Sequence, residues 1–494
     1  MEYIAAYDFG TSGVKAVIVS KNGRIVAVRE KGYPLLRPQP LYVEQRPEDF
    51  WDAVCEVTHG VLEDSGVDPA DIKGLSFSVQ AVTLIPVDED GNVLHNAISW
   101  LDCRAEKQAN EINENAGAIL VRSQDSQSRI LWIKENMPDM YEKTKYFLEC
   151  DGFLQYKCTG IMAVPQDYDG ILWRHPAIQA YYDACDLLID KEKLPPMVEA
   201  CREYGRLDAK GAAELGLCEG TPVFGGMIDV PAAAAGCACL APGDAHVYFG
   251  SSGWVSAIID QVYETSEGTY QLNSIIPGIM IYGGCTNSCC TMQNWVIDQF
   301  YPREKEILGD KIFDWLSDEM NKVPDGCDDL YAAPWMFGEQ FPIADPHIRA
   351  MFFNISDVHT RAHFLKAALE SICFSMRGQL EICNKDTGIE VTKLGANGGG
   401  SLSPVWMQML ADITGVPVEV PEESRHSGAI GAALSVAIGL GWYSPEDISA
   451  FVHVDKVYQP NPANKELYDR KYANWYKMYY AVKDLYSELN GGIA

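Results

Sequence analysis

The residues best suited to chemistry lie in two glycine-rich bends of nearly the same sequence. Phe9-Gly10-Thr11-Ser12-Gly13 and Phe249-Gly250-Ser251-Ser252-Gly253 agree at four of five positions and lie 240 residues apart. Such a bend points several backbone N–H groups at one place, and glycine with small hydroxyl residues lets an anion approach closely. Two bends of this kind are suited to holding the phosphates of a nucleotide. Either bend alone would be interpreted as an ordinary hairpin turn, but the duplication argues against that.

Two charged residues flank the first bend. Asp8 precedes it, and its carboxylate is placed to hold Mg²⁺ on those phosphates, directly or through water. Lys15 follows Gly13 by two residues and is either a phosphate ligand or a solvated strand lysine, with nothing in the sequence to decide between them. Neither the Walker A spacing nor GxGxxG occurs, so P-loop and Rossmann proteins have no support.

A third carboxylate, Asp229, lies where an apolar segment meets a small-residue segment. The stretch from Gly225 to Gly236 runs through Met227 and Ile228 into Asp229, then Pro231 and four alanines. This pattern predicts a strand or loop that ends at the N-terminus of a helix. The helix dipole and free N–H groups favour the ionised carboxylate, which is then available as a general base or metal ligand. A plain N-cap is the alternative, and this segment alone favours it.

Two further segments are candidates for ligand binding. Gly395 to Ser401 has three consecutive glycines between an expected strand and helix, where a flat ligand or phosphate can lie against backbone. Trp100-Leu101-Asp102-Cys103-Arg104 joins an aromatic ring, a carboxylate and a guanidinium. That set is suited to binding a polyol, or it is a surface Asp–Arg pair beside a core tryptophan.

Metal sites have weaker support. His359 and His363 are four residues apart but lack the glutamate of a zinc hydrolase helix between them. Cys285, Cys289 and Cys290 lack a second spaced pair, so we interpret them as buried thiols.

The elements that must position these residues alternate between strands and helices. Strands at 3–7, 14–20 and 24–29 form a predicted antiparallel meander with a turn at Asn22-Gly23, and a second hairpin surrounds the second bend. The expected elements between and after them are a helix at 47–63, a buried strand at 74–79, a hairpin at 84–94, a helix at 359–377, a strand ending at Gly395, a helix at 402–415 and a helix at 463–489 with a core aromatic stripe. The pattern predicts an α/β chain, and the repeat predicts two related lobes with a boundary near Pro242-Gly243.

Length and composition narrow the function classes. The chain has 494 residues, 69 acidic and 39 basic, for a formal charge of −30. The length predicts more than one domain. Without a basic stripe, nucleic acid is not an expected partner, and without an apolar run of about 20 residues no membrane segment is expected. The first residues lack a signal-peptide pattern, so the 15 cysteines are expected to be reduced in the cytosol.

Taken together, the motifs resemble those of the FGGY carbohydrate kinases, which have the actin/hexokinase/Hsp70 fold. The resemblance runs from Tyr3 to the last helix, and its most specific part is the signature from Gly398 to Gly415 with Pro417-Val418 after it. The other matching segments are Asp8 to Lys15, Glu44 to Trp51, Trp100 to Arg104, Gly225 to Gly236, Gly250 to Gly253 and Gly338 to Pro342. The resemblance implies two ribonuclease H-like lobes around a nucleotide cleft, with 1–243 as the N-terminal lobe and 244–494 as the C-terminal lobe. It also implies ATP-dependent phosphorylation of a sugar or polyol hydroxyl.

The resemblance implies roles for individual residues. Asp229 matches the catalytic base and, with Asp8, the Mg²⁺ site. The implied substrate contacts are Gln80, Ala81, Val82, Trp100, Asp102, Arg104 and Asp229. The implied ATP contacts are Gly10, Thr11, Ser12 and Lys15 in the first lobe, and Gly250, Ser251, Ser252, Gly399, Gly400 and Ser401 in the second. Relatives are often dimers, so a homodimer is expected.

Within the family the chain is most similar to the xylulokinase group, with two departures. Val82 occupies a position where that group carries a substrate-contacting histidine, and Arg129 replaces a usual lysine. Losing the histidine removes a hydrogen-bond partner for a sugar hydroxyl, which weakens the expected preference for D-xylulose. The leading hypothesis is a kinase for a ketopentose such as D-xylulose. The alternatives are a kinase for ribulose, glycerol, erythritol or gluconate, and a non-catalytic sugar-binding member.

Overall fold

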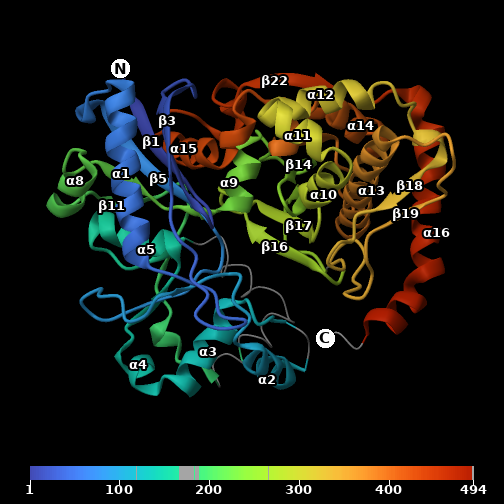
Figure 1. Cartoon of the computed structure of the whole chain (residues 1–494). Helices are drawn as coiled ribbons and strands as arrows, with labels where there is room; N and C mark the ends of the chain where they lie inside the picture. Colours follow the sequence, from blue (N-terminus) through green and yellow to red (C-terminus); the bar gives the residue numbers. More distant parts are fainter. Residues whose placement is uncertain (118–119, 166–182, 184–187, 265, 492–494) are drawn as a thin grey trace. The chain divides into compact units, whose positions relative to one another are not determined.

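Contacts within the chain divide it into two units, each built on its own sheet. The computed structural model describes residues 1–117, 120–165, 183, 188–264 and 266–491 (Figure 1). Unit 1 comprises Met1–Gly236, Leu272–Ile279 and Gly428–Val452, and unit 2 comprises Cys237–Gln271, Met280–Ser427 and His453–Ala494.

The sheet of unit 1 begins with the predicted meander. Strands β1 (Tyr3–Phe9), β2 (Gly13–Ser20) and β3 (Ile25–Gly32) pair antiparallel in succession, which confirms the prediction. The turn between β2 and β3 requires a glycine, because Gly23 has φ 78° and a Cβ there would lie 1.8 Å from the carbonyl oxygen of Phe451. The full order is β11-β12-β5-β1-β2-β3, with β13 also paired to β5. The further strands are β5 (Ile72–Val79), β11 (Glu203–Arg206), β12 (Pro222–Phe224) and β13 (Met227–Ile228).

Helix α1 (Pro47–Ser65) packs on β2 and β3 of this sheet. Pro47 occupies the first turn and Gly66 ends the helix in the left-handed conformation, as helix-terminus preferences predict. Its inward face buries Trp51, Val54 and Thr58, whereas Cys55 is half-buried. The other helices of unit 1 are α2 (Glu106–Ala116), α3 (Ser126–Asn136), α4 (Pro138–Lys143), α5 (Cys150–Thr159), α8 (Ala209–Leu215), α9 (Asp229–Gly236) and α15 (Ser427–Gly439), whose first residue belongs to unit 2.

The predicted hairpin at 84–94 is only partly formed. Its turn is present, since the Asp88 N–H donates to the Asn92 carbonyl at 3.1 Å. The ladder of β6 (Ile85–Val87), however, is with β8 (Tyr146–Leu148), far along the chain. Unit 1 also contains two short strand pairs, β4 (Glu44–Gln45) with β7 (Ala97–Ile98) and β9 (Val164–Pro165) with β10 (Met197–Val198). Unit 2 contains one such pair, β18 (Tyr331–Ala333) with β19 (Met351–Phe353).

The sheet of unit 2 repeats the topology of the first. Its order is β16-β17-β15-β14-β20-β21-β22, with β14 antiparallel to β15 and parallel to β20, just as β1 is antiparallel to β2 and parallel to β5. The strands are β14 (Asp244–Phe249), β15 (Gly253–Ile259), β16 (Thr269–Asn273), β17 (Met280–Thr286), β20 (Lys393–Gly398), β21 (Val418–Pro421) and β22 (Val454–Tyr458). Leu272 and Asn273 of β16 belong to unit 1. Both glycine bends therefore occupy the same place in equivalent sheets.

One predicted boundary in this sheet was wrong. Strand β20 continues past Gly395 to Gly398, because it stays paired with β14 up to the contact of Phe249 with Gly398. Gly395 pairs with His246 inside this strand, and the position needs a glycine because a Cβ there would lie 2.6 Å from the Cβ of Cys237. The glycine loop thus starts at Gly399, in a short 3-10 turn.

Unit 2 contains two long helices. Helix α13 (Arg361–Thr387) begins two residues later and ends ten residues later than expected, because Thr360 caps it with the His363 side chain. In α16 (Lys465–Asn490), Tyr468, Tyr472 and Trp475 are buried. This confirms the prediction that the aromatic stripe of the last helix belongs to the core. The other helices are α10 (Cys290–Phe300), α11 (Pro302–Leu308), α12 (Ile312–Met320) and α14 (Pro404–Thr414).

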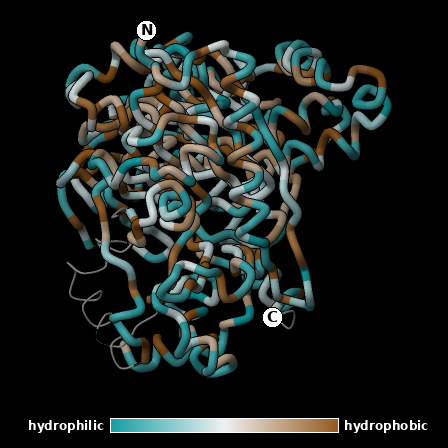
Figure 2. The backbone as a smooth tube through the Cα atoms, turned by 90° about the vertical axis from the view of Figure 1, so that its left-hand side faces the viewer, coloured by the Kyte–Doolittle hydropathy of each residue, from teal (hydrophilic) through white to brown (hydrophobic). Residues whose placement is uncertain are grey.

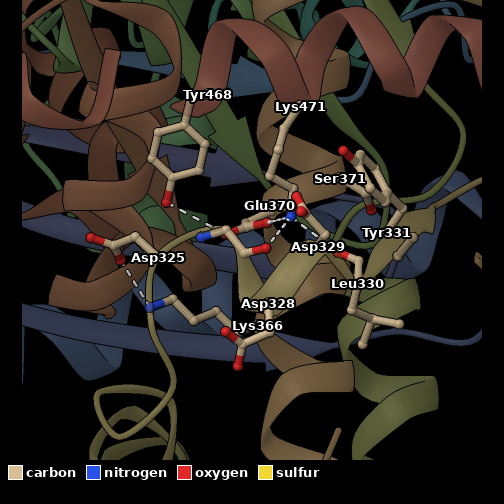
Figure 3. Close-up of polar contacts among 12 residues, drawn as sticks. Asp325, Asp328, Asp329, Leu330, Tyr331, Lys366, Glu370, Ser371, Tyr468 and Lys471 are labelled. Carbon is tan, nitrogen blue, oxygen red and sulfur yellow. Dashed lines mark hydrogen bonds and ion pairs between the residues drawn. The ribbon is translucent and has the colours of Figure 1, made fainter. Parts of the chain in front are cut away.

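A buried ion pair joins α13 to α16 (Figure 3). The Lys471 Nζ lies 2.8 Å from Glu370 Oε2 and also donates to the carbonyl oxygens of Gly326 at 2.5 Å and Leu330 at 3.0 Å. Both side chains are at most 1% exposed. The segment Gly326–Asp329 that Lys471 holds has positive φ at all four residues, and so the ammonium fixes an unusual left-handed turn.

The described residues contain no helix that is long and apolar enough to cross a membrane, and hydrophobic stretches of the chain are short in Figure 2.

Candidate active site

Asp8 and Asp229 lie at the same edge of the unit 1 sheet. Strands β1 and β13 both run parallel to β5 and flank it, with Asp8 paired to Ser78 and Ile228 paired to Val79. The carboxyl ends of the three strands therefore coincide, and two strand spacings separate the aspartates by roughly 10 Å. Ligands of open α/β sheets bind at this edge.

Asp8 sits in a narrow polar niche within unit 1. The Ser78 hydroxyl donates to Asp8 Oδ1 at 3.3 Å. Gly428, in the first turn of α15, is so close that a Cβ there would lie 2.7 Å from the same oxygen. Lys15 is the residue opposite Asp8 across the β1–β2 ladder, so the two side chains share one face of the sheet. A side chain at 428 would displace the carboxylate.

Asp229 is the first residue of α9, directly after β13, as the sequence predicted. The alanines that follow it let α9 pack tightly against α15, because a Cβ on Gly431 would lie 1.9 Å from the Ala232 carbonyl oxygen. Asp229 itself is half-buried. Small residues on both helices thus bring the helix N-terminus with Asp229 to the sheet edge.

The first glycine bend is held by side chains from three other segments. The Trp100 Nε1 donates to the Thr11 hydroxyl at 2.8 Å, and the Gln45 Nε2 donates to the Thr11 carbonyl at 2.9 Å. The Tyr33 hydroxyl donates to the Gly10 carbonyl. Tyr33 and Gln45 were not recognised in the sequence as site residues, because only their contacts over 23 and 34 positions reveal the role.

Gln80 is the next link in this network. Its Nε2 donates to Gln45 Oε1 at 3.0 Å. The Gln80 side chain is 4% exposed, yet its Oε1 accepts no hydrogen bond. Because an unpaired buried acceptor costs about 1–3 kcal/mol, this oxygen is suited to receiving a ligand hydroxyl. Ala81 and Val82 follow it and are half-buried.

The segment from Trp100 to Arg104 differs from both of its sequence interpretations. Trp100 is 40% exposed, whereas Asp102 is fully buried and Arg104 is 9% exposed. Arg104 binds Asp102 through two parallel contacts of 2.9 and 2.8 Å and binds Glu44 at 2.7 Å. A surface ion pair beside a core tryptophan is therefore wrong. Contact of Asp102 and Arg104 with a substrate stays a prediction.

Glu44 completes this buried cluster. Burial raises its pKa, but hydrogen bonds from Asn96 and Arg104 outweigh burial and hold the pKa below its ordinary value. Arg104 also lies 3.9 Å from the ring centroid of Tyr42, a cation–π contact. The cluster holds the loop before α1 against the strand that leads to Trp100.

In unit 2, the second bend and the glycine loop after β20 lie side by side. Gly250 follows β14 and Gly399 follows β20, and these parallel strands end together. A Cβ on Gly400 would lie 2.8 Å from the Cβ of Phe249, so the two loops touch. Ser251 and Gly399 are exposed, whereas Ser401 is buried and donates to the Gly398 carbonyl at 2.7 Å. The exposed backbone of both loops is available to one ligand.

Backbone hydrogen bonds join the start of α10 to the second bend. The N–H groups of Cys289 and Cys290 donate to the carbonyls of Ser251 at 2.9 Å and Gly250 at 2.8 Å. Cys289 is buried as expected, but Cys285 and Cys290 are only half-buried. A hydrogen bond from the Cys289 thiol and nearby backbone N–H groups lower the pKa of Cys290.

No cluster of three His, Cys, Asp or Glu side chains suited to a metal occurs among the described residues. His359 and His363 instead contact Asp328, through its carbonyl and its carboxylate, each at 3.2 Å.

Comparison with known proteins decides the family. Residues 3–236 match the model of the FGGY family of carbohydrate kinases, N-terminal domain, and residues 264–440 match its C-terminal domain. The chain belongs to the FGGY family of carbohydrate kinases. It is therefore a phosphotransferase that acts on an alcohol group, with ATP as cosubstrate.

The similar proteins act on different sugars. The chain is 30% identical to the xylulose kinase of Bacillus subtilis (strain 168) over 502 residues, 99% of each protein. It is 28% identical to the gluconokinase of the same strain over 473 residues, 91% of this chain and 89% of that protein. The crystal structure of xylulose kinase from Rhodospirillum rubrum superposes with a TM-score of 0.85 at 24% identity, covering 98% of this chain and 100% of that one. This likeness confirms the expected two-lobed α/β fold of the actin/hexokinase type.

Proposed function

We propose that this FGGY kinase transfers the γ-phosphoryl group of ATP to a hydroxyl of a ketopentose such as D-xylulose. The observation that carries the proposal is the meeting of Asp229, Asp8 and the first glycine bend at one sheet edge, next to the buried acceptor of Gln80. Similarity over the whole chain to a xylulose kinase supports the choice of sugar.

Asp229 is the proposed catalytic base. Its carboxylate would accept the proton of the attacking hydroxyl and orient that oxygen toward the γ-phosphorus. The N-terminus of α9 favours the ionised carboxylate that this task needs. Phosphoryl transfer asks mainly for positioning and charge neutralisation, so a base fixed by tight helix packing suits the reaction.

The glycine loops are the proposed ATP contacts. In unit 1 these are Gly10, Thr11 and Ser12, with Lys15 nearby, and in unit 2 they are Gly250, Ser251, Ser252, Gly399, Gly400 and Ser401. A chain of charge −30 must bind polyphosphate locally, and backbone N–H groups supply positive potential where net charge does not.

The residues present fit Mg²⁺. Mg²⁺ usually keeps several waters and binds through one or two carboxylates plus substrate phosphates, so it needs no dedicated cluster. Asp8 and Asp229 are the proposed carboxylates, and the ion would neutralise charge on the phosphates.

The proposed substrate contacts favour an uncharged sugar over a sugar acid. Gluconate would need a cationic partner for its carboxylate. Arg104 donates to Asp102 and Glu44, and Arg129 donates to backbone carbonyls, so neither is set aside for a substrate carboxylate. Val82 supplies no polar side chain, which is why ribulose, glycerol and erythritol remain alternatives to D-xylulose.

The test is a coupled ADP-release screen over D-xylulose, D-ribulose, glycerol, erythritol and gluconate. We expect the highest kcat/KM with a ketopentose. A kcat/KM at least tenfold higher for gluconate than for either ketopentose would overturn the substrate class. No sugar-dependent turnover, with binding detected by thermal shift, would support the non-catalytic alternative for this chain.

The remaining proposals concern organisation. We propose that two lobes enclose ATP and sugar in a cleft, that the chain forms a homodimer, and that it is located in the cytosol. Compaction in small-angle scattering on adding sugar and an ATP analogue would support closure of the lobes, and an unchanged radius of gyration would contradict it.

A further inference from the structure

Arg129 is a fully buried arginine whose Nη1 and Nη2 donate to backbone carbonyls. It lies in the first turn of α3 and is 0% exposed. Its Nη1 donates to the carbonyl oxygens of Ile98 at 2.9 Å and Ser99 at 2.6 Å, and its Nη2 donates to the carbonyl oxygen of Val82.

These carbonyls belong to the two segments that carry the proposed substrate contacts. Val82 ends the stretch that begins with Gln80, and Ser99 directly precedes Trp100. The segments also meet through backbone, since the Leu84 and Ile98 N–H and carbonyl groups bond reciprocally at 3.0 and 2.9 Å. The guanidinium of Arg129 therefore fixes the spacing between the segment that contains Gln80 and the segment that contains Trp100.

The backbone at Val82 needs such support. Val82 has φ 47°, a left-handed conformation that a β-branched residue rarely adopts. A strained residue persists only where its surroundings hold it, and strain of this kind costs of order 1–3 kcal/mol. The contact from Arg129 to the Val82 carbonyl is a restraint on that conformation.

Lysine would not substitute for this arginine. A guanidinium is planar and presents several donors in a fixed fork, so it reaches carbonyls on two segments at once. An ammonium is a single point and reaches fewer of them. The two departures from the xylulokinase pattern, Val82 and Arg129, are thus in direct contact in the fold.

We propose that Arg129 is a specificity-determining positioning residue, which sets the sugar selectivity by holding the Gln80–Val82 and Ser99–Trp100 segments at a fixed spacing. It acts through these segments and does not touch the substrate. The proposal rests on the proposed function, because it takes Gln80 and Trp100 as sugar contacts.

The test compares Arg129→Lys with Lys134→Arg. Lys134 lies on the same helix and donates to the Leu188 carbonyl at 2.8 Å, away from both segments. For Arg129→Lys we expect KM for the best sugar to rise about tenfold, KM for ATP to change less than twofold, and the ratio of kcat/KM between the two best sugars to change at least fivefold. Lys134→Arg should leave all three within twofold. Equal changes in both KM values, or an unchanged sugar ratio, would overturn the proposal.

A rescue variant separates positioning from general damage. Val82→Gly in the Arg129→Lys background removes the cost of a positive φ, so we expect it to recover at least part of the sugar KM. If Arg129→Lys does not fold, the double variant is measured in its place against Val82→Gly alone. No recovery in the double variant, or equal sugar ratios in the double and Val82→Gly variants, would count against the proposal.

A binding readout distinguishes failure of this proposal from failure of the proposed function. If the wild type turns over no sugar, the proposed function fails. Arg129 is then judged by calorimetric binding of the two best-bound sugars without ATP. A change in their affinity ratio in Arg129→Lys supports the proposal, and an unchanged ratio or no binding of any sugar overturns it.

Discussion

Replacing Lys471 by methionine should destabilise unit 2 severely. The substitution keeps an apolar stem but removes the ammonium that contacts Glu370 and the carbonyls of Gly326 and Leu330. Glu370 would then be a buried carboxylate with its remaining contacts to the Gly326 N–H at 2.9 Å and the Tyr468 hydroxyl at 3.4 Å. Removing one partner of a buried pair costs about 3–5 kcal/mol, because an uncompensated charge stays in the core.

The assay is urea unfolding followed by circular dichroism and tryptophan fluorescence. A loss of about 4 kcal/mol, with an m-value of about 3 kcal/mol/M, lowers the unfolding midpoint by about 1.3 M urea. Lys465→Met is the matched control, since Lys465 is on the same helix and pairs with Asp469 at 2.5 Å with its side chain 76% exposed. An exposed pair of this kind contributes at most about 1 kcal/mol.

The double variant Lys471→Met/Glu370→Gln completes the test. Removing the orphaned charge should recover part of the loss, so the double variant should be more stable than Lys471→Met alone. A shift of the midpoint in Lys471→Met no larger than that in Lys465→Met would contradict a stabilising role of the buried pair. A double variant less stable than Lys471→Met would contradict it as well.

Three further outcomes follow from the geometry. Burial raises the pKa of the Glu339 carboxyl from 4.5 to about 7, so between these pH values the folded state keeps a proton that the unfolded state releases. The stabilisation that this proton provides is full below pH 4.5 and is lost as the pH rises through 7. In urea titrations, the free energy of unfolding should therefore fall by about 2.5 kcal/mol less between pH 5 and pH 8 in Glu339→Gln than in the wild type. An equal fall in both proteins would contradict this. Trp100→Phe removes the bond to Thr11, a net loss of about 1 kcal/mol, so KM for ATP should rise about fivefold, whereas Trp442→Phe elsewhere in unit 1 should not change it. Asp229→Asn should lower kcat by about 10²–10⁴-fold without lowering the thermal midpoint; full activity would remove Asp229 from its role as base.

Much of this fold could be predicted from local sequence patterns. The Asn22-Gly23 turn and the repeated glycine bends specify hairpins by themselves, because turn chemistry depends on adjacent residues. Asp229 was placed at a helix start by Pro231 and the alanines after it. The aromatic stripe of α16 was assigned to the core by its spacing alone.

Contacts between segments that are distant in the sequence could not be predicted from local patterns. Nothing near Gln45 in the sequence indicates that it bonds both Thr11 and Gln80. The extent of β20 depends on its neighbour β14, and buried Asp102 accepts a hydrogen bond from the distant Val43 N–H. Tertiary pairing decides such features, and a local pattern does not encode it.

The product of the reaction tests the proposed kinase activity most directly. Purified chain is incubated with ATP, Mg²⁺ and the best sugar of the screen, and the phosphorus species are resolved by ³¹P NMR. We expect ADP and a sugar phosphate ester in equal amounts, without inorganic phosphate. ADP accompanied by inorganic phosphate and no ester would contradict it.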